Sequence, residues 1–111
     1  MDTRPWRGAS YPLQVVPISQ SVSGAAIVVA GQVGFVPIVC AGLLRSSANG
    51  TMTFRDSDTN PISPAFPVAS AFMAWDNIAA VRAPVGKGID LNTSTAVNGW
   101  VGVILVPEAL A

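Results

Sequence analysis

The hydrophobic and polar positions near the end of the chain alternate in a way that predicts two adjacent β-strands. Residues 89–95 place Asp90 and Asn92 between apolar or methyl-bearing side chains, and this period of two is typical of a strand with one solvated face. Residues 97–99 contain Asn-Gly, which favours a turn. Residues 100–106 are apolar at nearly every position, and a strand that is apolar on both faces is covered on both faces.

Alternate residues of this last strand point to opposite sides, so the strand presents two apolar faces. One of these faces is formed by Trp100, Ile104 and Val106. In a chain of 111 residues, the cover for this second face could be another copy of the protein. We therefore predict Trp100, Ile104 and Val106 as a self-association interface.

The remaining pattern predicts short strands separated by turns rich in Gly, Pro and Asn, and no stretch has a sustained helical period with caps. The expected strands are residues 11–18, 25–30, 33–46, 51–55, 62–66, 69–75 and 78–83. In the fourth of them, Met52 and Phe54 should point inward and Thr53 outward. Short strands at this spacing favour an all-β sandwich or barrel.

The first ten residues follow neither a helical nor a strand period. They carry Arg4, Trp6 and Arg7, and Trp and Arg are the residue types that most often anchor interfaces. Pro5 favours an extended backbone. The alternatives are a frayed terminus and a docking arm that is mobile in the free protein and ordered on its partner. We predict residues 1–19 as an extended arm with an edge strand, and residues 20–111 as the sandwich domain.

The composition is unusual for a lone soluble domain. Charged residues make up 11% of the chain and hydrophobic residues 50%, whereas an ordinary domain has about 25% charged residues. Either a membrane or an assembly could hide the poorly charged surface. The net charge of zero argues against nucleic-acid binding through a basic patch.

A membrane helix is the weaker of these two explanations. Residues 18–44 carry no charge, and about 20 apolar residues suffice for a spanning helix. However, the run contains Gln32, Pro37 and several glycines, and its apolar residues are mostly Val, Ile and Ala. Two strands broken near Gly31 explain the same letters better, so we expect no membrane partner.

Catalytic and metal-binding motifs find little support. The chain has no His, and its single cysteine, Cys40, lies in an apolar run, which is typical of a buried structural cysteine. Asp56, Asp58 and Asn60 have a spacing that occurs in cation-binding loops, but Pro61 stands where such a loop needs Gly. We interpret them as loop carboxylates and predict a protein that is not an enzyme, with no cofactor and no metal.

Five stretches together resemble a known family. They are AAIVVAG at 25–31, NGTMTFRD at 49–56, NPISPAFP at 60–67, AFMAWDN at 71–77 and GKGIDLNTSTAVNGWVGVILV at 86–106. Their order is similar to that of small virion proteins of tailed bacteriophages with a jelly-roll-like sandwich. The resemblance covers roughly residues 20–107 and consists of strand and turn patterns. It departs from the family where Ile78 and two alanines replace an expected Gly-Trp-Phe.

This resemblance implies a single-domain, jelly-roll-like β-sandwich of about eight short antiparallel strands. It also implies a structural virion protein that decorates or cements the phage capsid as a homotrimer. Its partners would be the major capsid protein or other virion proteins, contacted by Arg4, Trp6 and Arg7, and its location would be the surface of the head. The alternatives are a head-fibre, spike or tail module that binds a host glycan or protein, and a small membrane protein.

Overall fold

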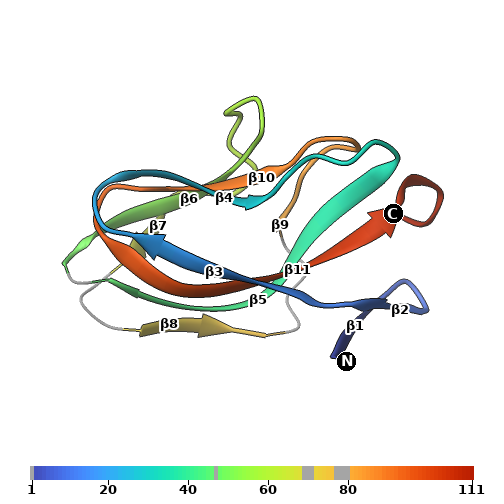
Figure 1. Cartoon of the computed structure of the whole chain (residues 1–111), viewed down its shortest axis with the longest axis horizontal. Helices are drawn as coiled ribbons and strands as arrows, with labels where there is room; N and C mark the ends of the chain where they lie inside the picture. The colour runs from blue at the N-terminus through green and yellow to red at the C-terminus, as the bar shows by residue number, and fades with distance from the viewer. Residues whose placement is uncertain (1, 47, 69–71, 77–80) are drawn as a thin grey trace.

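The described residues form two antiparallel β-sheets that face each other and a separate two-stranded hairpin, as Figure 1 shows for the computed structural model of the protein. The structure describes residues 2–46, 48–68, 72–76 and 81–111. The all-β class is confirmed, and the described residues form eleven strands where about eight were predicted. In chain order the elements are β1 (Thr3–Trp6), β2 (Ala9–Pro12), β3 (Gln14–Gln20), β4 (Gly24–Val29), β5 (Phe35–Ser46), β6 (Gly50–Asp56), β7 (Phe66–Val68), β8 (Phe72–Trp75), β9 (Val81–Arg82), β10 (Ile89–Thr93), β11 (Val97–Pro107) and the 3-10 helix η1 (Glu108–Leu110).

The strand order of the two sheets is that of a jelly roll. One sheet runs β4-β10-β6-β7, and the facing sheet runs β3-β11-β5-β8 with the short β9 also paired to β5. With β9 and the hairpin β1-β2 set aside, eight strands pair first with last, second with seventh, third with sixth and fourth with fifth. This pairing is a long antiparallel ribbon rolled into two sheets, and it agrees with the predicted jelly-roll-like sandwich.

The main hydrophobic core fills the space between these two sheets. Met52 and Phe54 of β6 are 1% and 2% exposed, so their predicted inward direction is confirmed. Val101 and Val103 of β11 meet them from the facing sheet. Trp75 of β8 packs against this core with its ring edge-to-face on Phe54, at 6.3 Å between centroids. Strand β11 therefore buries one of its two apolar faces in the main core, as the sequence pattern predicted.

The uncharged run from residue 18 to residue 44 belongs to strands β3, β4 and β5. The predicted break near Gly31 is confirmed, because β4 ends at Val29 and β5 begins at Phe35. Pro37 lies inside β5, where a missing N–H would normally break a ladder. Its carbonyl accepts the N–H of Ala83, which follows β9. In an antiparallel strand the N–H and C=O of one residue point to the same side, so the N–H that Pro37 lacks would also point toward β9. The hydrogen bonds between β5 and β11 are therefore kept. No helix in the described residues is long and apolar enough to cross a membrane.

The predicted turn at residues 97–99 is wrong. These residues belong to β11, and the chain reverses instead between residues 93 and 97, with bends at residues 94 and 95. Val97 is fully buried and pairs with both Gln20 and Ser46, so core packing overrides the local turn preference of Asn-Gly. Gly99 has a positive φ of 141°, and its backbone lies close to the Leu43 carbonyl, where a Cβ would not fit.

Three other strand predictions differ from the structure. The strand expected at 62–66 is placed later, at β7, and the one expected at 11–18 is divided between β2 and β3. Pro12 and Leu13 lie at that division, and Leu13 is outside either strand. The strand expected at 78–83 is reduced to β9 in the described residues. Residues 69–71 and 78–80 of the predicted strands lie outside the described part of the chain.

The N-terminal segment is a β-hairpin, so the expectation of an arm without strand structure is wrong. β1 and β2 pair antiparallel through a two-residue turn, with Trp6 opposite Ala9. Arg7 and Gly8 in this turn have φ of 46° and 83°, as the tight hairpin turns that match strand twist require. Asn-Gly or Asp-Gly is the usual signal for such a turn, and Arg-Gly did not reveal it. Figure 1 shows the hairpin at the end of the sandwich where β11 finishes.

Candidate functional site on the outer face of the five-stranded sheet

The N-terminal hairpin covers one half of the outer face of the five-stranded sheet. Beneath it lies a second hydrophobic cluster, separate from the main core. Trp6, Tyr11 and Leu13 pack on this cluster from above. Its buried members are Val36, Ile38, Cys40, Ile104 and Val106. The second apolar face of β11 is therefore covered, as the sequence predicted, but the cover is the chain's own hairpin.

This arrangement corrects the predicted self-association interface. Ile104 and Val106 are both 0% exposed, so neither offers surface to a second copy while the hairpin is in place. Trp100, the third predicted residue, is half-buried and lies outside both clusters. The structure thus separates Trp100 from the other two, although all three are on the same face of β11.

A row of apolar side chains crosses the uncovered half of this face. Trp100 lies opposite Pro17 of β3 and Leu43 of β5, and Leu43 lies opposite Ala74 of β8. Directly opposed residues share a face of the sheet, so these side chains form one line across four strands. Pro17 and Ala74 are exposed, and Leu43 is half-buried like Trp100. We call Pro17, Leu43, Ala74 and Trp100 the tryptophan row.

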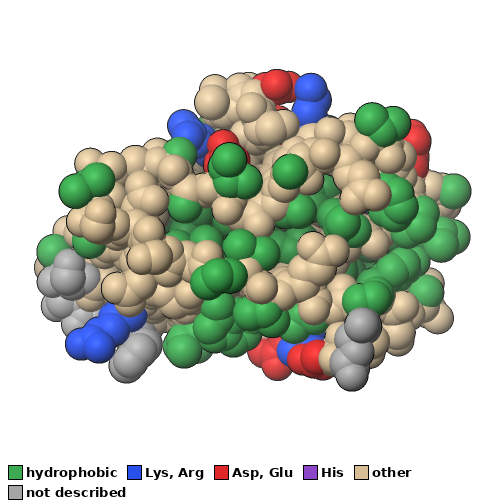
Figure 2. Space-filling model, in the orientation of Figure 1, with side chains coloured by type: hydrophobic (Ala, Val, Ile, Leu, Met, Phe, Trp, Pro, Cys, Tyr) green, Lys and Arg blue, Asp and Glu red, His purple; other side chains and the backbone are tan. Residues whose placement is uncertain are grey.

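The two sides of the tryptophan row have different surroundings. Val15, two positions before Pro17 on β3, is 58% exposed. On the other side, the next line across the sheet contains Ser19, Asn98 and Arg45. Figure 2 shows that hydrophobic side chains occupy much of one view of the molecule and that charged groups are few and scattered. Exposed apolar area that is bounded by polar residues is typical of an interaction surface.

An ion pair between Arg4 and Asp76 links the hairpin to the body of the protein. Arg4 lies 2.6 Å from Asp2 within the hairpin and 2.9 Å from Asp76, which follows β8. The hydrogen bond that Arg4 donates to the Asp2 carboxylate is the main cause that raises the pKa of Arg4 above its ordinary value. Desolvation lowers this pKa, and the hydrogen bond to Asp76 raises it further. The Arg4 charge is therefore already paired within the chain, where the resemblance implied a contact with another virion protein.

Trp6 and Arg7 are also engaged within the chain. The Arg7 guanidinium donates to the backbone oxygen of Ala111 at 2.8 Å and lies 5.2 Å from the centre of the Trp6 ring. Arg82 of β9 approaches the same ring at 5.9 Å, and such cation–π contacts are favourable. The contacts of Arg4, Trp6 and Arg7 in this structure thus dock the hairpin on the chain's own sheet, and their predicted contact with a virion protein stays a prediction.

Two polar atoms under the hairpin have no partner. The indole Nε1 of Trp6 and the hydroxyl of Tyr11 are both buried without a hydrogen bond. A buried donor that is left unpaired costs about 1–3 kcal/mol. Apolar contacts and the Arg4–Asp76 ion pair hold the hairpin on the sheet. The two unpaired polar atoms oppose them, so the docked hairpin is less stable than its buried apolar area suggests.

Cys40 lies in the cluster beneath the hairpin. It is 2% exposed, which confirms the prediction of a buried structural cysteine. Burial raises the pKa of its thiol, mainly through desolvation, and a protonated thiol is a poor nucleophile. Cys40 is thus suited as a natural probe of whether the hairpin is closed.

The carboxylates at residues 56–60 stabilise a loop and show no arrangement for a cation. Asp56 is 4% exposed, and its Oδ1 accepts the backbone N–H groups of Asp58 and Asn60. Desolvation favours the neutral form, but these hydrogen bonds outweigh it and lower the pKa of Asp56 below its ordinary value. Asp58 is paired with Lys87 at 2.7 Å. The described residues contain no cluster of three or more His, Cys, Asp or Glu that could hold a metal.

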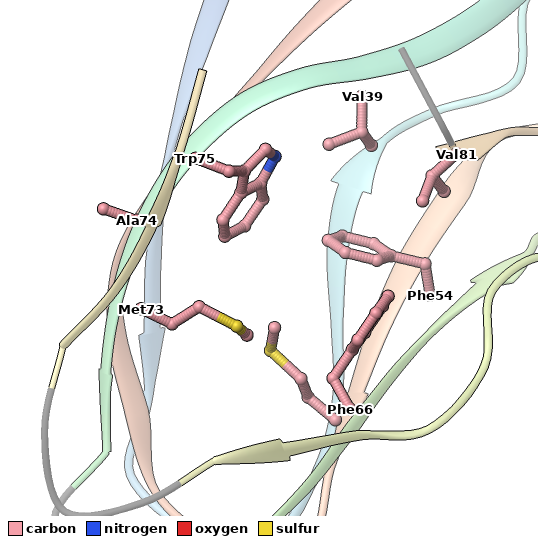
Figure 3. A pocket seen from close by; sticks show the side chains of 8 residues that line it. Val39, Phe54, Phe66, Met73, Ala74, Trp75 and Val81 are labelled. Atoms are coloured by element: carbon pink, nitrogen blue, oxygen red, sulfur yellow. The ribbon is translucent and has the colours of Figure 1, made fainter. Parts of the chain in front are cut away.

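A second candidate site is a cavity between the two sheets, shown in Figure 3. It has a volume of about 290 Å³ and is partly open to the outside. Its walls include the rings of Phe54, Phe66 and Trp75 and the thioethers of Met52 and Met73.

Comparisons of this chain with protein-family models, with curated proteins and with solved structures found no match. The functional argument therefore depends on the residues and the geometry described above.

Proposed function

We propose that this protein is a structural component of a bacteriophage particle, which decorates or cements the capsid as a self-associating trimer. The observation that carries the proposal is the tryptophan row, an uncovered apolar line on a sheet whose other half is already buried by the N-terminal hairpin. A chain with only 11% charged residues has little means of keeping such a surface in water. An assembly that buries it accounts for both features.

The fold and the sequence pattern support the same proposal. Jelly-roll sandwiches are common in viral capsid proteins, and also in lectins, so the strand order agrees with the resemblance to phage virion proteins without selecting it alone. The partners would be other copies of this chain and the major capsid protein or another virion protein. Each 100 Å² of apolar surface buried at such contacts contributes about 2.5 kcal/mol before the cost of association.

The mechanism is mechanical. A trimer that lies across the seam between neighbouring capsid subunits adds buried apolar area on both sides of the seam, and this addition is repeated over a symmetric shell. Because many copies act in parallel, a modest contribution from each raises the resistance of the shell to internal pressure. Among the predicted contact residues, Trp100 can contact a neighbouring subunit while the hairpin is closed. Trp6 can do so only when the hairpin opens, because it packs on the chain's own sheet.

The oligomeric state tests this proposal. Light scattering at micromolar concentration should give about three times the monomer mass, since stable apolar interfaces of this kind rarely dissociate at that concentration. Trp100→Asp should weaken the trimer by about 2 kcal/mol or more, as expected for an interface hot spot. Val22→Asp, in a loop where Val22 is 67% exposed, is the matched control and should remain trimeric. A monomeric wild-type protein, or a trimer unaffected by Trp100→Asp, would contradict the proposal.

Attachment to the particle separates this function from its alternative, a fibre, spike or tail module that binds a host glycan or protein. The outer face of the other sheet favours that alternative through its polar residues, where Asp90 lies opposite Arg55 and Asn92 opposite Thr53. A decoration protein would be present in many copies over the head. A receptor-binding module would be present in a few copies at one vertex or on the tail, and electron microscopy of labelled particles distinguishes the two.

A further inference from the structure

We propose that the cavity between the sheets is a binding site for a small, uncharged aromatic molecule of about two fused rings. This site shares only Ala74 with the tryptophan row, and Figure 3 shows that the Ala74 side chain points away from the cavity. The cavity lies between the sheets, with walls from both of them, whereas the tryptophan row lies on the outside of one.

The chemistry of the walls selects an apolar guest. Figure 3 shows the side chains of Phe54, Phe66, Met73 and Trp75 gathered around a common space from strands β6, β7 and β8. None of the described lining residues carries a charge, and the indole N–H of Trp75 is their only side-chain hydrogen-bonding group. A charged or strongly polar molecule would lose its hydration there without receiving partners in exchange.

The rings and sulfur atoms favour an aromatic guest over a purely aliphatic one. Phe54 and Trp75 already meet edge-to-face, with 77° between their planes, and a planar ring inserted beside them can continue this packing. The thioethers of Met52 and Met73 add sulfur–aromatic contacts, and methionine side chains adjust to the shape of a guest. Five of the lining side chains are thus of the two types that best contact an aromatic ring.

The volume sets the size of the guest. An apolar cavity of about 150 Å³ stays dry and accepts a benzene molecule. The cavity in this protein has about 290 Å³, which is roughly twice that volume and fits two fused rings. A single side chain from a partner protein would leave much of it empty, so a free molecule fits the space better than a docked side chain.

Methionine NMR offers a direct test, with naphthalene as the probe. The chain has three methionines, so a protein with 13C-labelled methionine methyl groups gives three signals. On titration with naphthalene, the signals of Met52 and Met73 should shift in a saturable manner, because the ring current of the guest acts on both. The Met1 signal serves as the reference for effects of solvent.

Cavity-filling variants provide the matched comparison. Val39 lies at the wall of the cavity and is 1% exposed, so Val39→Phe places a ring where the guest would bind and should weaken naphthalene binding at least tenfold. Met73→Phe fills the cavity from β8, where the side chain is only half-buried, and covers the case in which Val39→Phe does not fold. Val22→Phe makes the same change on an exposed loop and should bind as wild type.

The same titration can overturn the proposal in three ways. Absence of a saturable shift up to the solubility of naphthalene would show that the cavity takes no aromatic guest. Equal binding by wild type and by both folded cavity-filling variants would place the guest elsewhere. Shifts of Met52 and Met73 that depend on protein concentration without naphthalene would show that a second copy of the chain occupies the cavity.

Discussion

Replacing Trp6 with alanine is the sharpest test of the closed hairpin. Trp6 is the largest side chain over the second cluster, and a tryptophan-to-alanine change in a core costs about 3–5 kcal/mol. Trp6 is only half-buried, and its unpaired Nε1 already imposes about 1–3 kcal/mol that the substitution relieves. We therefore expect the closed hairpin to lose about 2 kcal/mol relative to the open one.

The single thiol of the chain reports this change. Cys40 is 2% exposed beneath the hairpin, so a thiol reagent must wait until the hairpin opens. A loss of about 2 kcal/mol raises the open population roughly 30-fold, since 1.4 kcal/mol corresponds to tenfold. The rate at which Cys40 reacts with an aromatic disulfide at pH 8 should therefore rise by about the same factor in Trp6→Ala.

Tyr11→Phe is the control for this measurement. It removes the unpaired hydroxyl of Tyr11 but keeps the ring that covers the cluster, so the reaction of Cys40 should be unchanged or slower. Equal rates for wild type and folded Trp6→Ala would refute the reasoning, because the hairpin would then not control access to Cys40. A rate equal to that of global unfolding, measured separately, would show that the whole sandwich opens instead.

Three further predictions concern stability. Phe54→Ala should cost about 3–5 kcal/mol in chemical denaturation and Thr53→Ala, on the other face, less than half of that; similar losses would mean that the inward face of β6 is misassigned. Folding lowers the pKa of Asp56, so the stability that its carboxylate contributes should be complete above the unfolded pKa of about 3.9 and lost as the pH falls through the folded pKa. The difference in unfolding free energy between wild type and Asp56→Ala should therefore narrow in acid. A difference that does not depend on pH down to 2 would contradict this. Gly99→Ala should lower the melting temperature, because its positive φ and the nearby Leu43 carbonyl leave no room for a Cβ; an unchanged melting temperature would argue against this backbone path.

Local patterns were most informative where one physical cause acted alone. The alternation of Met52 and Phe54 with polar neighbours predicted their burial, because a strand with one wet face has a fixed period. The doubly apolar stretch at 100–106 predicted a strand covered on both sides. The Asn-Gly signal at 98–99 was misleading, because the burial of Val97 in the core outweighs a local turn preference. The hairpin turn at Arg7 was missed because Arg-Gly is a weak local signal.

The sequence by itself determined the all-β class, the inward faces of the main strands and the need for two covers on β11. Each of these follows from the spacing of apolar side chains along a short segment, and that spacing does not depend on distant residues. The tertiary structure alone decided that the N-terminal hairpin provides the second cover, so that Ile104 and Val106 are enclosed while Trp100 stays at the surface. It also brought together the walls of the cavity from five strands. Both depend on contacts between residues far apart in the chain, and these contacts are set by which surfaces fit together and bury the most apolar area.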